Sequence, residues 1–333
     1  MKRLLVLSAF FAVAARADEP LPRIAEKLVR SGDEIVVCGQ LFHTTTKVVL
    51  WTDPGGYDAY RVVPRFGPDG GPVDRKTKPD LTKAGPGWRS HYGMRRGGLS
   101  PQEIEQVRGG WDLPLLQRVV DQFVIHFDAV GTSRGCFQVL QDERGLSVHF
   151  MLDLDGTIYQ TLDLKESAWH ATIANGRSIG IEVANIGAYH LNDRGRIDRW
   201  YKPDPDGKIR IVDPGTSQPL QLNSSAFELR PSRDDLIVGT IQGQELQQYD
   251  FTQQQYEALA KLTATLCTIF PKIRCDYPRD AAGALRREKL PDPDFETYQG
   301  ILGHYHVQTN KVDPGPAFQW DRLIDSSRKL MAR

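Results

Sequence analysis

Short apolar runs, several of them alternating with polar residues, predict a series of strands along the chain. The densest set covers 123–127, 147–152, 157–162 and 178–184, and earlier candidates lie at 35–37, 47–51 and 60–63. The sequence Asp153-Leu154-Asp155-Gly156 predicts a hairpin turn between the second and third strands of the dense set. Gly and Pro clusters predict turns at 53–56 and 68–71.

Helical periodicity is clearest towards the C-terminus. Thr252 and Gln255 form a predicted capping box, and apolar residues then recur at helical spacing up to Pro271. A shorter amphipathic helix is predicted from about Ala317, and the sequence Ser-Pro-Gln-Glu at 100–103 is typical of a helix start. Strands combined with helices in this way indicate an α/β protein.

The chain divides into regions of different pattern. Residues 18–121 mix short apolar runs with Gly and Pro, and no flexible linker follows them, so this extension is expected to pack on the core. Residues 122–333 hold the dense strands and the C-terminal helices. Within them, 192–250 is polar and punctuated by Asp-Gly and Pro-Gly pairs, which predicts an insertion of hairpins and loops. A last strand is predicted at 303–307.

The N-terminus has the features of a secretory signal peptide. Lys2 and Arg3 precede an apolar run at 4–15, and Ala15-Arg16-Ala17 supplies small residues for cleavage. The run is shorter than the roughly 20 residues that a spanning helix needs. Residues 1–17 are therefore expected to be removed, leaving no membrane span and placing the mature protein in the periplasm or outside the cell.

Composition and cysteine content narrow the class. The 42 Lys and Arg balance 42 Asp and Glu, so no bulk positive field attracts nucleic acid, and a hydrophobic content of 40% excludes wholesale disorder. The four cysteines are too few and too scattered for a disulfide scaffold. Cys267 and Cys275 could bridge in an oxidising compartment, although sequence separation does not establish the required Cα distance. We expect a monomer.

Candidate chemistry lies in the strands and in the loop near the C-terminus. Alternation puts His126 on the strand face opposite Phe123 and Ile125, where a core position and a site position are both open. Glu182 is the lone charge in an apolar strand, either solvated or directed into a cleft. His304 and His306 are expected to share one strand face, with Asp313 following. Two imidazoles and a carboxylate leave one open position on a tetrahedral zinc, which suggests a catalytic metal site.

Several ordered motifs resemble the zinc-dependent N-acetylmuramoyl-L-alanine amidases of the amidase-2 type, a family that includes peptidoglycan recognition proteins and phage T7 lysozyme. The motifs are Val-Ile-His-Phe around His126, the run 147–160, Ala168-Trp169-His170-Ala171, Asn175 with Ser178-Ile179-Gly180-Ile181-Glu182, Gly303-His304, and the loop 311–316. They span about 122–190 and 251–323. The resemblance implies a mixed central β-sheet flanked by helices, and it leaves the extension and the insertion unexplained.

The resemblance also implies roles for individual residues. His126, His304 and Asp313 match the zinc ligands, and an Asp at the third position is typical of the bacterial amidases, whereas the recognition proteins and the phage enzyme usually carry Cys there. Lys311 matches the catalytic lysine, and Glu182 matches the acidic residue that acts as a base. Together they imply hydrolysis of the amide bond between N-acetylmuramic acid and L-alanine in peptidoglycan or its fragments.

Further positions are implied near the substrate. His170 and Trp169 fall in a motif of the substrate cleft, with a packing role as the alternative, and Asn175 and His149 are expected to contact substrate too. His306 stands where relatives often have Asp, so it is expected to support a ligand or face the cleft rather than to be a fourth ligand. Val148 replaces the Tyr that the phage enzyme carries before its counterpart of His149, which moves the role of base onto Glu182.

Three alternatives stay open. The first is a peptidoglycan-binding protein without turnover, which retention of all five metal and catalytic positions disfavours. The second is a zinc amidohydrolase acting on another exported amide, although no His-Glu-x-x-His helix is present. The third is an interaction protein that uses the extension, where His43, Trp51 and the aromatic sequence at 57–60 could line the cleft or cap the sheet.

Overall fold

The computed structural model describes residues 25, 28–60, 91–215, 222 and 228–333. Among the described residues, those from Gly32 onward belong to one compact unit, and the few before it belong to a separate one. The predicted signal peptide, the turn at 68–71 and most of the strand at 60–63 lie outside the described residues. Within the described part of the chain, every helix is too short or too polar to span a bilayer.

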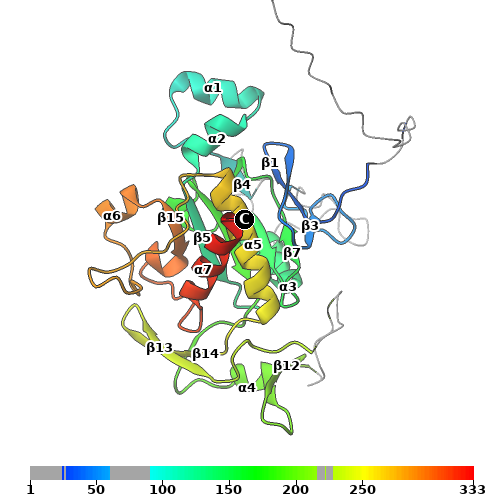
Figure 1. Cartoon of the computed structure of the whole chain (residues 1–333), viewed down its shortest axis with the longest axis vertical. Helices are drawn as coiled ribbons and strands as arrows, with labels where there is room; N and C mark the ends of the chain where they lie inside the picture. The colour runs from blue at the N-terminus through cyan, green and yellow to red at the C-terminus, as the bar shows by residue number, and fades with distance from the viewer. Residues whose placement is uncertain (1–24, 26–27, 61–90, 216–221, 223–227) are drawn as a thin grey trace, which may run out of the picture. The chain divides into compact units, whose positions relative to one another are not determined.

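A mixed six-stranded sheet forms the centre of the larger unit (Figure 1). Its order is β15 (Gly300–Gly303), β5 (Gln122–Phe127), β9 (Ser178–Val183), β6 (Phe150–Leu152), β7 (Ile158–Gln160) and β3 (Val48–Leu50). Only the β6–β7 pair is antiparallel, and the predicted turn at 153–156 connects it. The predicted mixed sheet is therefore confirmed.

Two helices cover one face of this sheet. Helix α5 (Gln253–Ile269) starts at the predicted capping box, in which the Thr252 side chain accepts from the Gln255 backbone and the Gln255 side chain accepts from the Thr252 backbone. Helix α7 (Trp320–Met331) packs beside it (Figure 1). Their apolar sides share one core with alternate residues of the strands, among them Phe123 and Ile125. Strand alternation consequently leaves His126 on the other face.

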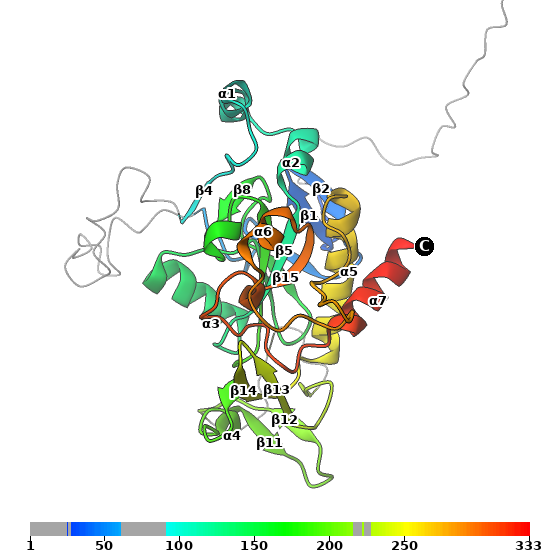
Figure 2. The same cartoon turned by 90° about the vertical axis from the view of Figure 1, so that its left-hand side faces the viewer.

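The other face of the sheet carries smaller elements. Helix α3 (Ser133–Gln138) continues into a π-helical turn (Val139–Arg144) and packs on Met151 and Tyr159, on the side opposite α5 (Figure 2). Strands β4 (Tyr92–Met94) and β8 (Glu166–Ala168) form a two-stranded ladder, followed by a 3-10 turn (Thr172–Ala174). Elsewhere in the described chain lie helices α1 (Pro101–Gly109), α2 (Leu113–Val119) and α6 (Asp292–Thr297).

The N-terminal extension contributes to the core where the structure describes it. Strands β1 (Glu34–Val37) and β2 (Gln40–His43) form a hairpin, and β3 is the edge strand of the central sheet. Gln160 of β7 bonds both backbone groups of Val36, accepting at 2.7 Å and donating at 2.8 Å. Because a buried backbone amide needs a partner, this pair anchors β1 on the sheet.

The stretch 192–250 folds as short hairpins where it is described. Strands β11 (Tyr201–Pro203) and β12 (Ile209–Ile211) pair after helix α4 (Ile197–Trp200). Strands β13 (Ile237–Ile241) and β14 (Gln244–Gln248) form a longer hairpin, and β10 (Tyr189–His190) joins its β14 edge.

Two predictions are corrected here. The strand predicted at 303–307 ends at Gly303, and His304–His306 form a 3-10 turn in which the His304 carbonyl accepts from the Val307 and Gln308 amides. His304 and His306 therefore do not share a strand face. The bridge considered for Cys267 and Cys275 is not formed, since all four cysteines, which the structure describes, are free thiols.

Candidate metal centre

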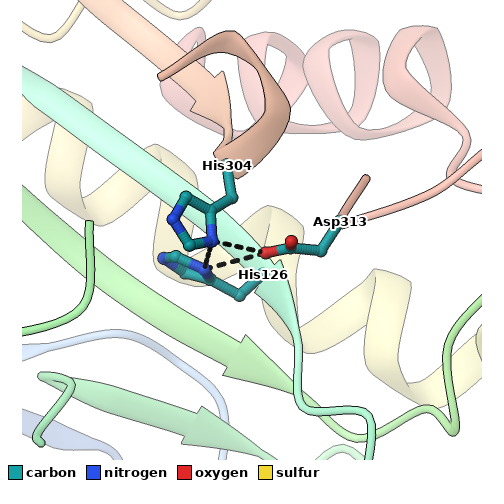
Figure 3. A group of neighbouring side chains, drawn as sticks. All are labelled: His126, His304 and Asp313. Atoms are coloured by element: carbon teal, nitrogen blue, oxygen red, sulfur yellow. Dashed lines mark hydrogen bonds and ion pairs between the residues drawn. The ribbon is translucent and has the colours of Figure 1, made fainter. Parts of the chain in front are cut away.

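Two imidazoles and one carboxylate converge at the carboxyl end of the sheet (Figure 3). Strands β5 and β15 run parallel, with Ile125 opposite Gly303. His126 and His304 each follow one of these paired residues, so both lie at the C-terminal ends of neighbouring strands. Nδ1 of His126 lies 2.9 Å from Nδ1 of His304, and Oδ2 of Asp313 lies 2.9 and 3.0 Å from them. Ligand sites in open α/β sheets lie at this edge.

The tautomers of the two rings show what the cluster can hold. Nε2 of His304 faces Oε1 of Gln308 at 2.7 Å, and an amide oxygen only accepts, so Nε2 carries the proton and Nδ1 presents a lone pair. Burial, and then the neighbouring His304, lowers the pKa of His126 to about 4, which favours the neutral ring. Two imidazole nitrogens and a carboxylate oxygen meet at this point, a donor set that suits a cation.

His170 supports His126 from behind. Its Nδ1 lies 3.0 Å from Nε2 of His126, and its own Nε2 lies 3.2 Å from Oγ of Ser178. A proton on Nε2 of His126, shared with His170, leaves Nδ1 of His126 free for a ligand. The His170 ring lies over Gly180, where an added Cβ would come within 2.5 Å of it, so only glycine leaves this space on β9.

Asn175 shapes the loop that carries His170. Its Oδ1 accepts from the backbone amides of His170 at 3.1 Å and Ala171 at 2.7 Å. The backbone amide of Trp169 donates to Ser147 at 3.0 Å, and its half-buried indole packs near Gly93. Asn175 thus acts on the cluster through the backbone of His170, and a contact of Trp169 with substrate stays a prediction.

Glu182 and Lys311 lie beside the cluster. On the sheet, Glu182 is the register partner of His126, so both side chains are on the same face. Oε2 of Glu182 is buried and finds no hydrogen-bond partner among the described residues. Burial and then the charge of Asp313 raise the pKa of Glu182 well above its usual value, and the Lys311 ammonium opposes this. A buried carboxyl with a strongly raised pKa is common in active sites.

His149 is fully buried behind the cluster. Its Nδ1 accepts from the Gly180 amide at 3.1 Å, and its Nε2 lies 3.0 Å from both the Glu166 carbonyl and the Arg95 guanidinium. Arg95 is also fully buried, and its guanidinium donates to the carbonyls of Leu164, Asn175, Gly176 and Ser178. Burial followed by the Arg95 charge lowers the pKa of His149 to about 3, which keeps the ring neutral.

His306 is directed away from the cluster. Its Nδ1 accepts from the Gly303 amide at 2.9 Å, and its Nε2 donates to the Arg286 carbonyl at 2.7 Å. His149 and His306 are both 0% exposed, so neither offers a surface to substrate in this structure. The predicted substrate contact of His149 is therefore corrected, and of the two options for His306 the structure favours support of the ligand turn over a cleft position.

A second group of potential ligands lies in the extension. Asp33, Glu34 and His43 lie within reach of one another, but Nδ1 of His43 is already paired with Asp33 at 2.8 Å. His43 also lines a cavity of about 470 Å³ between β2 and the C-terminal ends of α5 and α7. That cavity is on the face of the sheet opposite the cluster, so His43 does not line the candidate site.

Three residues that support the centre were not predicted as site residues from the sequence. Gln308 and Ser178 bond the outer nitrogens of His304 and His170, and Arg95 holds the loops beneath them. Gln308 carried a signal in hindsight, because it follows His304 by four residues, one helical turn. Arg95 carried none, since its carbonyl partners are 69 or more residues away in the chain.

The candidate metal centre lies at the C-terminal ends of the sheet strands, beside the Glu182 carboxyl and the Lys311 ammonium. This arrangement is typical of a hydrolase. The sequence agrees with this class, because residues 116–316, more than half of the chain, match the family model described as N-acetylmuramoyl-L-alanine amidase. The chain belongs to this family, and it is an amidase that acts on peptidoglycan. No curated protein matches the chain.

Three solved structures illustrate the similarity of the chain to known folds. The selenomethionine derivative of AmpD is 16% identical over 71% of this chain and 89% of that one, with a TM-score of 0.36. AmiD from E. coli, in complex with the substrate anhydro-N-acetylmuramic acid-L-Ala-D-gamma-Glu-L-Lys, is 17% identical over 71% and 65%, with a TM-score of 0.34. Staphylococcus aureus AmiA is 12% identical over 72% and 95%, with a TM-score of 0.34.

Proposed function

We propose that His126, His304 and Asp313 hold a zinc ion, and that the enzyme hydrolyses the amide bond between N-acetylmuramic acid and L-alanine. The observation that carries this proposal is the meeting of two imidazole nitrogens and a carboxylate oxygen within 3.0 Å of one another. Zinc bound there supplies Lewis acidity and lowers the pKa of a bound water from 15.7 to roughly 7. Three protein ligands leave one position open.

The neighbouring side chains supply the proton transfer and the positive charge. Glu182, whose Oε2 has no partner among the described residues, takes the proton of the attacking water and returns it to the departing nitrogen of L-alanine. The Lys311 ammonium stabilises negative charge as it develops on the carbonyl oxygen. His170 keeps Nδ1 of His126 unprotonated and correctly directed. The non-catalytic alternative has no use for a buried, unpartnered carboxyl at this position.

The test is product analysis on defined muropeptides. The purified protein, with zinc, is incubated with a soluble 1,6-anhydro-muropeptide and, separately, with intact sacculi, and the products are identified by mass spectrometry. We expect a muramic acid with a free lactyl carboxylate and a stem peptide with a free L-alanine amine. Cleavage within the stem peptide, or no cleavage of either substrate, would contradict the proposal. The two arms also show whether soluble fragments or intact wall are preferred.

We further propose that the protein acts outside the cytoplasm, as a monomer, after removal of residues 1–17. The basic residues, apolar run and small residues at the N-terminus support export. N-terminal sequencing of protein recovered from the periplasm or medium is expected to begin at Asp18. A chain that keeps Met1 and stays in the cytoplasm would refute the export proposal, and light scattering of the mature protein tests the monomer.

A further inference from the structure

Two of the three proposed zinc ligands lie on irregular backbone. His126 is held by ladder bonds on both sides of β5. His304 begins a 3-10 turn, and Asp313 lies in the loop that follows, so neither has a sheet ladder to position it. A metal site needs its donors held to within a fraction of an ångström. Something other than the central sheet must therefore hold these two segments.

The β13–β14 hairpin contacts both segments. At its tip, Nε2 of Gln242 donates to the carbonyls of Tyr305 at 2.8 Å and Gln308 at 3.0 Å, and its Oε1 accepts from the Lys289 amide at 3.2 Å. The first two of these bonds hold the backbone of the turn that starts at His304. Gln308 in turn bonds Nε2 of His304. The tip of the hairpin thus bonds Tyr305 and Gln308, the first adjacent in sequence to the proposed ligand His304 and the second hydrogen-bonded to it.

The base of the same hairpin holds the loop of Asp313. Gln248 is fully buried, its Nε2 donates to the Pro314 carbonyl at 3.1 Å, and its Oε1 accepts from the Ala317 amide at 3.1 Å. Gly315 lies directly against this amide, since a Cβ there would be 2.2 Å from Oε1 of Gln248. On the neighbouring strand, Gly239 packs against Pro316 in the same way. The loop is therefore seated on the hairpin by contacts as well as by hydrogen bonds.

The backbone of Gln242 adds an independent observation. Gln242 has a φ of +51° and Gly243 a φ of +70°, so the two-residue turn has both residues in the left-handed region. Asn and Gly are preferred there, and a glutamine adopts this conformation at a cost. The side chain of Asn is one methylene too short to make the same three hydrogen bonds. The three bonds of the longer side chain offset the unfavourable backbone.

We propose that Gln242 and Gln248 are positioning residues of the metal centre, and that the β13–β14 hairpin braces the His304 turn and the Asp313 loop in the geometry that binds a divalent cation. This inference rests on the proposed zinc site. The inference gives part of the insertion at 192–250 a role in metal affinity, which the sequence alone does not assign. Residues that orient metal ligands typically contribute about 10- to 100-fold to affinity.

Gln247 provides a matched control on the same strand. It is buried like Gln248, and its Nε2 donates to the carbonyls of His190, Leu191 and Asp193. Because successive side chains of a strand point to opposite faces, these bonds are directed away from the ligand segments. Gln247→Leu and Gln248→Leu therefore remove the same kind of buried amide, with the same expected damage to the hairpin, and only the second loosens the Asp313 loop.

The experiment measures zinc affinity of the metal-free full-length protein by competition with a chromophoric chelator. We expect Gln248→Leu and Gln242→Asn to weaken zinc binding by about 10- to 100-fold, and Gln247→Leu to stay within about twofold of wild type. Gln242→Asn suits the left-handed turn and keeps the test valid if Gln248→Leu does not fold. The rise in melting temperature on adding zinc should shrink in the same order.

The outcomes separate the inference from the function on which it rests. If wild-type protein binds no zinc, the proposed function fails, and the inference fails with it. If wild type binds zinc and Gln242→Asn and Gln248→Leu retain its affinity, the inference alone is overturned. Equal losses in Gln247→Leu and Gln248→Leu would also overturn it, because they would indicate a general role of the hairpin in stability.

Discussion

Asp313→Ala is expected to abolish both zinc binding and amidase activity. Its Oδ2 is the only anionic donor of the cluster, and without it two neutral imidazoles remain to hold a divalent cation. Since even one lost oxyanion donor costs about 10²- to 10³-fold in kcat, removal of the metal should lower kcat/KM by at least about 10³-fold. His126→Ala and His304→Ala should behave alike. Bound zinc is measured by atomic emission on protein purified with excess metal, and activity by release of L-alanyl peptide.

His306→Gln is the matched control for the ligand variants. His306 is a buried imidazole on the same turn as His304, yet it bonds the Gly303 amide and the Arg286 carbonyl. Its replacement should lower the free energy of unfolding by about 1–3 kcal/mol, through loss of buried hydrogen bonds, and leave one zinc per chain. An Asp313→Ala protein that keeps its zinc and its activity would show that the ligand assignment is wrong.

Glu182→Gln is expected to reduce kcat by about 10²- to 10⁴-fold, the usual contribution of a general acid–base residue, with zinc content unchanged. The replacement keeps the shape of the side chain and removes its ability to accept a proton. Burial and Asp313 disfavour the Glu182 carboxylate in the folded protein, so the neutral amide should also raise the free energy of unfolding, by about 1 kcal/mol. Steady-state kinetics, metal analysis and chemical denaturation measure the three quantities.

Glu166→Gln is the control for that variant. Glu166 is another half-buried carboxyl with a raised pKa, due first to burial, but its partner is the Tyr60 hydroxyl at 3.3 Å. Glu166 is not among the charged groups that shift the pKa values of His126, Glu182 and Asp313, so its replacement should leave kcat unaffected. Normal turnover by Glu182→Gln would remove Glu182 from the mechanism, whereas an equal loss in both variants would point to a general effect of buried carboxyls.

The regular elements were largely predictable from local pattern. Strand β5, strand β9 and helix α5 carry side chains that alternate with the period of their own structure, so a window of a few residues is sufficient to identify them. The capping box at Thr252 is equally local. The turn at 304–306 was mistaken for strand because its geometry depends on the returning loop, where Tyr305 donates to the Asp313 carbonyl at 3.2 Å.

The candidate ligands were identified through motifs, and the structure then decided their arrangement. His126 lies 178 residues from His304 and 187 from Asp313 in the chain, yet their donor atoms meet within 3.0 Å. The hydrophobic periodicity of the sequence gives no information about the distance between residues so far apart in the chain. The buried positions of His149 and His306 were likewise invisible, because a histidine looks the same in sequence whether its ring nitrogens face substrate or a backbone carbonyl.

By itself, the sequence determined which segments form strands and helices, the family, and the residue types available for chemistry, because these depend on neighbours in the chain and on ordered motifs. Only the tertiary structure decided the meeting of the two imidazoles with Asp313, the support of His126 by His170, and the hydrogen bonds from Gln242 and Gln248 to the ligand segments. Those properties arise from hydrogen bonds between residues far apart in the chain, whose geometry exists only once the sheet, the turn and the hairpin have packed together.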